Sequence, residues 1–375
     1  MKFSAILDFQ DKSHIKAGDG LAAGVHPFFT SSPVLSKFLD TFQFEGESLI
    51  LGTGGNASIH YYEHAFSVST DCLVAVLNDE QKHNFDTKFI YYYLLGNIKL
   101  LENGFKGAGL KHISKSYIND IDIPTPTLEK QKQIVGILDE ANLLRQKRKE
   151  SIGLLDEYLK SVFLDMFGDP VNNSNDLTVE LLENLAEIRS GVTKGRKLEG
   201  KFTIDVPYMR VANVQDGFID LREIKTIKAT VNDIEKYKLE VGDLLLTEGG
   251  DPDKLGRGGI WRGEIEDCIH QNHIFRVRFD HNIVAPEYAS ALISSPHGKR
   301  YFLKSAKQTT GIATINSTQL KKFPFLLPEL TLQNQFAGIV KNAELIKQKM
   351  LTQSKELDHQ FQALMQKAFK HDVSN

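Results

Sequence analysis

The chain has 375 residues, 41% of them hydrophobic, which is enough to form two globular cores. Its net charge of −3 gives no general attraction for nucleic acid, so such contacts would need local basic groups. No apolar stretch approaches membrane-spanning length, and Asp8 and Asp11 stand where a secretory leader needs apolar residues. Cys72 and Cys268 are too few for a disulfide framework, so we expect a cytoplasmic protein with free buried thiols and no membrane contact.

The first unit, residues 1–122, is predicted to be mixed α and β. Apolar runs predict strands over 48–51 and 72–77, and a short helix is expected over 87–95. A glycine-rich segment, 52–56, follows the first strand. It lacks the lysine and hydroxyl residue of a phosphate-binding P-loop, so we interpret it as a tight turn between strands.

A seven-residue apolar repeat predicts a long helix within residues 123–168. The residues expected on its seam are Ile134, Leu138, Ala141, Ile152, Leu155, Leu159 and Val162. Arg145 and Arg148 interrupt this seam. A helix of roughly forty residues extends over about 60 Å and needs a partner to be stable. Gly168 is placed as its C-terminal cap, and the polar run over 169–178 predicts a hinge.

The second unit, residues 179–324, has the same character. Strands are predicted over 243–247 and 273–279, with a short helix over 286–293. A second long helix follows within residues 325–375. Its expected seam residues are Phe336, Val340, Ala343, Met350, Leu357, Phe361 and Leu364.

The segment 123–167 recurs without a gap as 325–369, at a constant offset of 202 residues. Outside the helices, Gly109-Leu110 falls on Gly311-Ile312 at the same offset, and the offset shrinks toward the N-terminus. One architectural unit is therefore used twice, with loop insertions in the second copy. Because one helix enters the second unit and the other leaves it, we expect the helices to pair antiparallel. Packing of each helix on a partner protein is the alternative.

The predicted fold class is α+β: two α/β domains joined by two long helices that form an antiparallel coiled coil, with a pseudo-twofold internal repeat. Several motifs across the chain resemble the specificity subunit of type I restriction-modification systems. These are IPTPTLEKQKQIV from Ile123, LLDE from Leu154, FGDP from Phe167, VPYMRVAN from Val206, and GIATIN from Gly311 followed by FPFLLP from Phe323. The resemblance covers essentially the whole chain in the order domain, helix, domain, helix.

The resemblance implies a non-catalytic reader of double-stranded DNA. Each domain would recognise one half of a bipartite, asymmetric sequence, and the helices would set the spacing and dock two methyltransferase subunits. Restriction motor-nuclease subunits would join for cleavage. No cofactor is expected on this chain, since S-adenosylmethionine, ATP and Mg would be used by the partner subunits.

Side chains that can hydrogen-bond base edges or phosphates supply the candidate DNA contacts. In the first unit these are Lys12, Ser13, His14, Lys16, Thr30, Ser31, Ser32, Asn56, Lys106, Lys111 and His112. In the second they are Lys194, Arg196, Lys197, Arg210, Asn213, Lys254, Arg257, Arg262, Gln271, Asn272 and Lys307. A solvated surface residue or a turn former is the alternative interpretation for each one taken singly.

Other conspicuous residues are expected to be structural. Trp261 and the tyrosines at 91–93 are interpreted as core or helix packing, not as stacking partners for bases. Cys268, His270 and His273 suggest a metal cluster, but alternation along a strand would point His273 away from the other two, so no metal site is predicted.

Two further functions stay open. A stand-alone DNA-modifying enzyme would need an adenine-methylation motif, a cofactor-binding glycine loop or a nuclease metal site, and the sequence offers none of these in context. A coiled-coil scaffold that does not bind DNA is the other possibility. For such a scaffold, charge reversal at Lys194, Arg196 and Lys197 would leave partner assembly and DNA association equally intact.

Overall fold

The computed structural model describes residues 1–250, 255–309 and 312–370. The chain divides into two compact units, Met1–Ser151 with Met350–Asn375 and Ile152–Lys349. Both long helices, α4 (Leu128–Phe167) and α10 (Leu330–Lys370), contribute a segment to each unit. Over the described stretches, no helix combines the length and the apolar character that crossing a bilayer requires.

The first unit is built on a four-stranded antiparallel sheet in the order β1-β7-β4-β5. Its strands are β1 (Leu7–Phe9), β4 (Ser48–Gly52), β5 (Ser58–Tyr62) and β7 (Cys72–Leu77). A second sheet pairs β2 (His26–Phe29) with β3 (Phe38–Leu39) and, in parallel, with β6 (Ser67–Val68). The strands predicted over 48–51 and 72–77 are thus confirmed.

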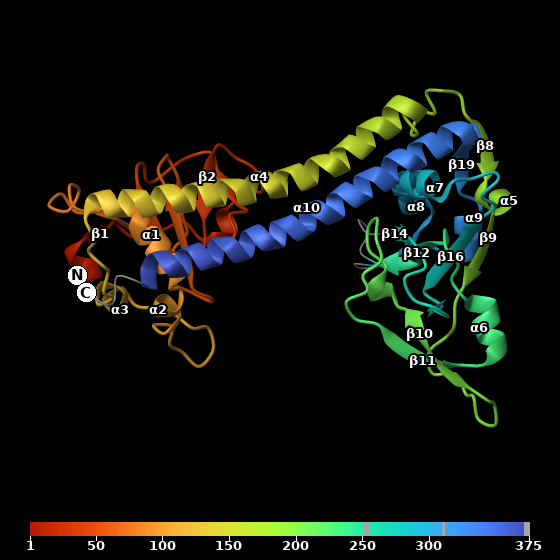
Figure 1. Cartoon of the computed structure of the whole chain (residues 1–375), viewed down its shortest axis with the longest axis horizontal. Helices are drawn as coiled ribbons and strands as arrows, with labels where there is room; N and C mark the ends of the chain where they lie inside the picture. The colour runs from red at the N-terminus through yellow and green to blue at the C-terminus, as the bar shows by residue number, and fades with distance from the viewer. Residues whose placement is uncertain (251–254, 310–311, 371–375) are drawn as a thin grey trace. The chain divides into compact units, whose positions relative to one another are not determined.

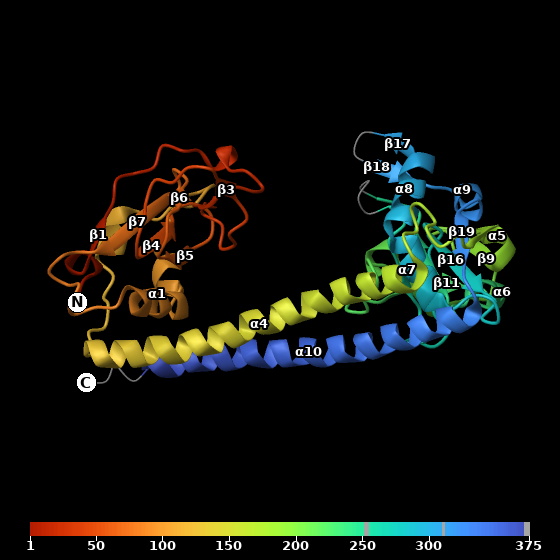
Figure 2. The same ribbon diagram turned by 90° about the horizontal axis from the view of Figure 1, so that it is seen from above.

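Helix α1 (Thr87–Gly96) covers one face of the first sheet (Figure 2). Asp86 caps it, because its carboxylate accepts hydrogen bonds from the backbone N–H groups of Lys88 and Phe89. The buried core joins Leu49 and Leu51 of the sheet to residues of α1 and of the long helices. The unit's remaining helices are η1 (Phe3–Ala5), η2 (Ala17–Asp19), α2 (Lys99–Glu102) and α3 (Lys115–Asn119).

The second unit repeats this topology. Its main sheet has the order β14-β12-β16-β9 (Figure 1). Strand β10 pairs with β11 and, in parallel, with β15. The strands are β9 (Ala186–Ser190), β10 (Ile204–Met209), β11 (Lys225–Ala229), β12 (Leu244–Thr247), β14 (Gly258–Ile260), β15 (Ile269–His270) and β16 (Ile274–Phe279). Strand order and direction match those of the first unit, so the internal repeat extends to the sheets.

Helix α7 (Pro286–Ser294) is the counterpart of α1, and both lie where short helices are predicted. Helix α6 (Val231–Tyr237), between β11 and β12, is part of the longer connection expected in the second copy. The other elements are β8 (Thr178–Leu181), α5 (Leu182–Leu185), η3 (Val211–Asn213), β13 (Gly249–Gly250), α8 (Pro296–Ser305), β17 (Lys307–Thr309), β18 (Ile312–Thr314), α9 (Ser317–Lys321) and β19 (Pro324–Leu327).

Within each unit the two long-helix segments run antiparallel. In the first, Ile134 and Leu138 share a buried cluster with Phe361, while Arg145, further along α4, donates to Asp358, which comes earlier on α10 (2.6 Å). In the second, Phe163 lies 5.6 Å from Phe336 between ring centroids. Asp156 there accepts from Lys347 at 2.6 Å. The residues expected on the two seams are all buried or half-buried.

The end of α4 follows the expected chemistry. The N–H of Gly168 donates to the carbonyl of Leu164, and its φ of +76° lies in the left-handed region, where a Cβ would collide with the side chains of Ser174 and Asn175. Glycine is therefore required at this cap.

Candidate nucleic-acid interface

The candidate residues of the first unit gather at one end of its main sheet. Leu7 pairs with Leu77 and Gly52 with Cys72, so the C-terminal ends of β1 and β4 lie beside the N-terminal end of β7, at one end of the sheet. The loop over 10–16 is tied there by a hydrogen bond from Thr70 N–H to the carbonyl of Ile15 (2.8 Å). We call the loops at this edge, residues 10–16, 30–32, 53–56 and 106–112, the first loop cluster.

Hydrogen bonds from side-chain hydroxyls to backbone carbonyls hold the first loop cluster together. The hydroxyls of Ser31 and Thr53 both donate to the carbonyl of Asp71, at 2.7 and 3.0 Å. Ser58 in turn donates to the Ser31 carbonyl. Gly52 must be small here, since a Cβ would lie 2.9 Å from the Ser31 Cα. The tight turn expected over 52–56 is thus present, with Gly55 in the left-handed region at φ +79°. This turn is the platform on which the neighbouring hairpin packs.

A hairpin over residues 106–112 is seated on this glycine turn. Its base is closed by two hydrogen bonds between the backbones of Lys106 and His112, at 2.9 and 3.0 Å. Gly55 N–H donates to the Lys111 carbonyl and Ile113 N–H to the Thr53 carbonyl. Lys106, Lys111 and His112 are all exposed, so the hairpin presents two lysine cations and an imidazole from a fixed base.

Most of the first-unit candidates are accessible. Lys12, His14, Lys16, Asn56, Lys106, Lys111 and His112 are exposed, and Thr30, Ser31 and Ser32 are half-buried. Ser13 is the exception, being only 3% exposed. Its hydroxyl donates to Gln43 and accepts from the N–H of Ile15, so it supports the loop from inside.

The second unit has the corresponding sheet end. Ser190 and Thr247, the last residues of β9 and β12, lie opposite Phe275 and Ile274 at the start of β16. The loop after β9 is tied to the turn before β16, because Asn272 N–H donates to the Val192 carbonyl (2.9 Å). We call the loops over 191–203, 248–257, 271–273 and 307–314 the second loop cluster, of which residues 251–254 and 310–311 are outside the described residues.

The hairpin of the second loop cluster matches that of the first. Strands β17 and β18 pair with each other, and β18 pairs with the glycine strand β13. Gly249 lies opposite Thr314, as Gly54 lies opposite His112 in the first unit. Ile315 N–H donates to the Glu248 carbonyl, which repeats the bond from Ile113 to Thr53. Both units thus build the same loop platform from different side chains.

Arg196 has a buried partner. Its guanidinium donates twice to the carboxylate of Asp233, at 2.8 and 2.9 Å, and this ion pair holds the pKa of the Asp233 carboxyl well below its usual range. Thr230 adds a hydroxyl hydrogen bond to the same carboxylate. Arg196 therefore anchors the loop, whereas its neighbours Lys194 and Lys197 remain exposed.

Arg210, Asn213 and Arg262 also have internal partners. Asn213 is 2% exposed and donates to two backbone carbonyls, and Arg210 donates to the carbonyl of Glu223. Arg262 lies at the opposite end of β12 from the loop cluster, where it donates to Glu287 and to Glu344 of α10, at 2.6 and 3.0 Å. Sequence alone does not separate these arginines from surface ones, because their acidic partners are distant in the chain.

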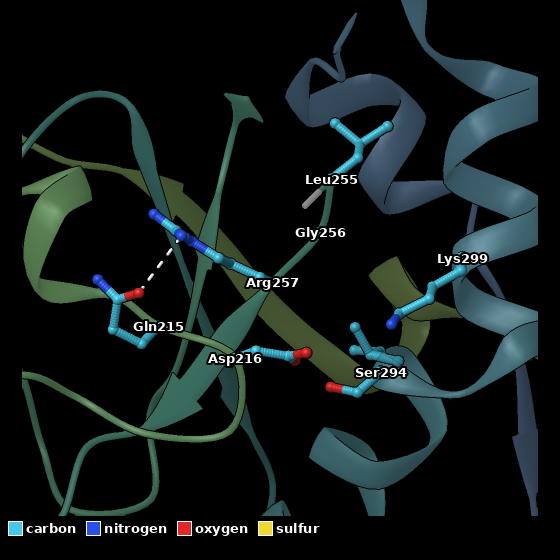
Figure 3. A pocket seen from close by; sticks show the side chains of 8 residues that line it. Gln215, Asp216, Leu255, Gly256, Arg257, Ser294 and Lys299 are labelled. Atoms are coloured by element: carbon cyan, nitrogen blue, oxygen red, sulfur yellow. Dashed lines mark hydrogen bonds between the residues drawn. The ribbon is translucent and has the colours of Figure 1, made fainter. Parts of the chain in front are cut away.

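The remaining described candidates of the second unit lie on the second loop cluster. Gln271 and Asn272 are half-buried and Lys307 is exposed, while Lys254 falls outside the described residues. Arg257 lines a cavity of about 470 Å³ together with Gln215, Asp216, Ser294 and Lys299 (Figure 3). Its guanidinium donates to Gln215 (3.3 Å). Lys299 of α8 was not among the candidates, although the basic run 297–307 points to this segment.

Two of the aromatic residues that are expected to pack in the core do so. Trp261 and Tyr92 are buried, at 1% and 2% exposure, and Tyr92 donates to Asp139 of α4 (2.6 Å). His270 is fully buried between the carbonyls of Tyr237 and Arg189, while His273 pairs with Glu248. Burial raises the pKa of the Cys268 thiol to about 12.

A duplicated α/β unit with polar loops gathered at one end of each main sheet is suited to a binding protein with two recognition surfaces. The chain matches the family model for the type I restriction modification DNA specificity domain twice, over residues 6–153 and 176–357. It therefore belongs to this family of DNA specificity domains.

Individual relatives are distant. A putative type I restriction enzyme specificity subunit, MjaX, of Methanocaldococcus jannaschii is 28% identical over 195 residues, which is 52% of this chain and 45% of that protein. The EcoBI specificity subunit of Escherichia coli is 23% identical over 359 residues, 88% of this chain and 74% of the relative. The match thus spans about half the length of the archaeal relative.

The fold has been seen before. A crystal structure of the S subunit of a type I restriction-modification system from M. genitalium superposes with a TM-score of 0.58, at 16% identity, covering 98% of this chain and 95% of that one. At this identity the likeness shows the fold alone.

Proposed function

We propose that this chain is the DNA-reading subunit of a type I restriction-modification complex, with one loop cluster for each half of a bipartite, asymmetric sequence. The observation that carries the proposal is the repeated platform, in which Gly54 opposes His112 and Gly249 opposes Thr314. The scaffold is the same twice, but the side chains on it differ. Two different half-sites follow from this combination.

Charge on the loops supports contact with a polyanion. The first loop cluster exposes Lys12, Lys16, Lys106 and Lys111, and the second exposes Lys194, Lys197 and Lys307. Such lysines neutralise phosphates, while nearby amides, hydroxyls and imidazoles are suited to base edges. The candidates in this proposal are the accessible ones; Ser13, Arg196, Asn213 and Arg262 act in it as structural supports.

Docking of two methyltransferase subunits on the long helices is the second part of the proposal. On α4 of the first unit, Leu143 and Leu144 are 48% and 57% exposed. The residues 202 positions later, Leu345 and Ile346 of α10 in the second unit, are 58% and 47% exposed. Exposed aliphatic pairs are unusual on a helix that needs no partner. Their repetition fits two copies of one partner.

We propose the rest of the assembly from the resemblance to the family. The helices pair as an antiparallel coiled coil, and residues 1–122 and 179–324 act as the two reading domains with a hinge over 169–178. Catalysis resides in the partners: the methyltransferase uses S-adenosylmethionine, and the motor-nuclease subunits use ATP and Mg. This chain itself holds no cofactor in the proposal.

Exchange of one reading domain tests the proposal. Residues 1–122 are replaced by the first domain of another family member, and DNA methylation is mapped in a methylation-free host that also expresses the methyltransferase subunit encoded beside this chain. The expected result is a change in one half of the recognised sequence only. A coiled-coil scaffold without a role in DNA reading would leave the sequence unchanged.

A further inference from the structure

Leu110 is an aliphatic side chain held out at the tip of a basic hairpin. It is 75% exposed, and it lies in the chain between Lys106 and Lys111, which are exposed as well. No acidic residue occurs between Glu102 and Asp120. An exposed aliphatic side chain among lysines, with no acidic residue nearby in the chain, fits a partner that carries negative charge and also offers apolar groups to contact.

The neighbouring glycine has no internal explanation. A Cβ built on Gly109 meets no atom within 4 Å, and its backbone lies outside the left-handed region. Gly107 differs, since its φ is +140° and a Cβ would lie 2.9 Å from the Leu110 carbonyl oxygen. Gly109 and Leu110 correspond to Gly311 and Ile312 at the offset of 202 residues. A glycine that the fold does not need allows close approach of a ligand to the backbone.

We propose, building on the function above, that the tip at Gly109-Leu110 enters a groove of the DNA at the first half-site. Leu110 contacts base edges there and helps to determine the sequence, while Lys106 and Lys111 contact the flanking phosphates. DNA meets both requirements, because its phosphates attract the lysines and its grooves present apolar groups such as the thymine methyl. Hydrogen bonds between Lys106 and His112 close the base of the hairpin before DNA arrives, which limits the backbone entropy that is lost on binding.

Two variants of the full chain test this inference in the methylation-free host with the methyltransferase subunit. Leu110→Ala removes the apolar contact, and Gly109→Val adds bulk where the free chain has space. Val241→Ala is the matched control, because Val241 is 65% exposed but lies between Glu240 and Asp243. Thermal unfolding of each variant is measured in parallel.

Leu110→Ala is expected to relax one position of the first half-site by about tenfold and to leave the second half unchanged. Gly109→Val is expected to lower methylation at all sites about tenfold or more at an unchanged unfolding temperature, and Val241→Ala to behave as wild type. The inference is overturned if both tip variants keep the wild-type sequence and level of methylation. A wild-type chain that directs no bipartite methylation would instead overturn the proposed function, and this inference with it.

Discussion

Gln131 and Gln333 lie 202 residues apart and make the same three hydrogen bonds. Each is fully buried, and each side-chain oxygen accepts from the backbone N–H that precedes a short helix, at 2.9 Å from Asp86 or Ala285. Each side-chain nitrogen donates to two carbonyls. These belong to Asn84 and Pro126 in the first unit and to Ile283 and Pro328 in the second. The start of each long helix is thereby fixed to its recognition domain.

Replacing either glutamine by leucine should destabilise its own unit. Gln131→Leu leaves the N–H of Asp86 and the carbonyls of Asn84 and Pro126 without this partner, at a cost of about 1–3 kcal/mol for each group that stays dry. We expect a loss of at least about 2 kcal/mol, measured by urea unfolding. Gln133→Leu, at an exposed position of the same helix, is the control and should change stability little. Equal effects of the two changes would contradict the structural role.

The lysines of the first hairpin should contribute charge without sequence information. Lys106→Ala with Lys111→Ala is expected to weaken binding of the assembled complex to specific and non-specific DNA alike. The slope of log affinity against log salt should become shallower by about 1 for each phosphate that a lysine no longer neutralises. Fluorescence anisotropy over a salt series measures both quantities. Lys2→Ala, at a lysine that pairs with Asp122 outside this hairpin, is the control; it removes one positive charge where the double variant removes two.

Arg196 and Lys197 are adjacent but should behave differently. Arg196→Ala breaks the bidentate pair with Asp233 and is expected to lower the stability of the second unit, with DNA affinity reduced only through the displaced loop. Lys197→Ala should reduce DNA affinity at unchanged stability, because Lys197 is exposed. Melting temperature and anisotropy together separate the two roles. If Arg196→Ala instead lowered DNA affinity at unchanged stability, the structural role of Arg196 would be contradicted.

Stability of the second unit should depend on pH through His270. Burial lowers the pKa of its imidazole to about 4, from the ordinary 6.5. Between these values the unfolded chain binds a proton that the folded chain does not, so stability decreases as the pH falls from 6.5 toward 4. The loss should approach about 3 kcal/mol. Urea titrations at several pH values measure it, and His270→Gln should flatten the slope over this interval.

Much of the fold could be predicted because the same pattern of apolar residues occurs in both copies of the repeat. The strands over 48–52 and 274–279 and the paired short helices follow from local apolar runs, which tertiary packing here does not override. Gln131 and Gln333 were visible as a repeated pair, but their function was not. It depends on carbonyls and N–H groups that are distant in sequence, which no spacing rule reveals.

The exposed side chains of the recognition loops were harder to predict from the sequence. Basic and polar residues mark which loops meet at the sheet ends, and the topology brings Lys12, Asn56 and Lys111 to one edge as a group. Individual side chains could not be assigned, because exposure depends on distant partners. Arg257 and Arg262 stand in similar basic, glycine-containing sequence on either side of β14. Glu287 and Glu344 nevertheless hold Arg262 at the end of β14 that lies away from the loop cluster.

Mapping of methylated adenines in a methylation-free host that expresses this chain with its neighbouring methyltransferase subunit tests the central claim most directly. Two readers on one chain predict a bipartite, asymmetric sequence with a modified adenine in each half and a fixed number of unspecified bases between them. A single uninterrupted motif, or no modification when both proteins are present and bound to each other, would contradict the two-reader account.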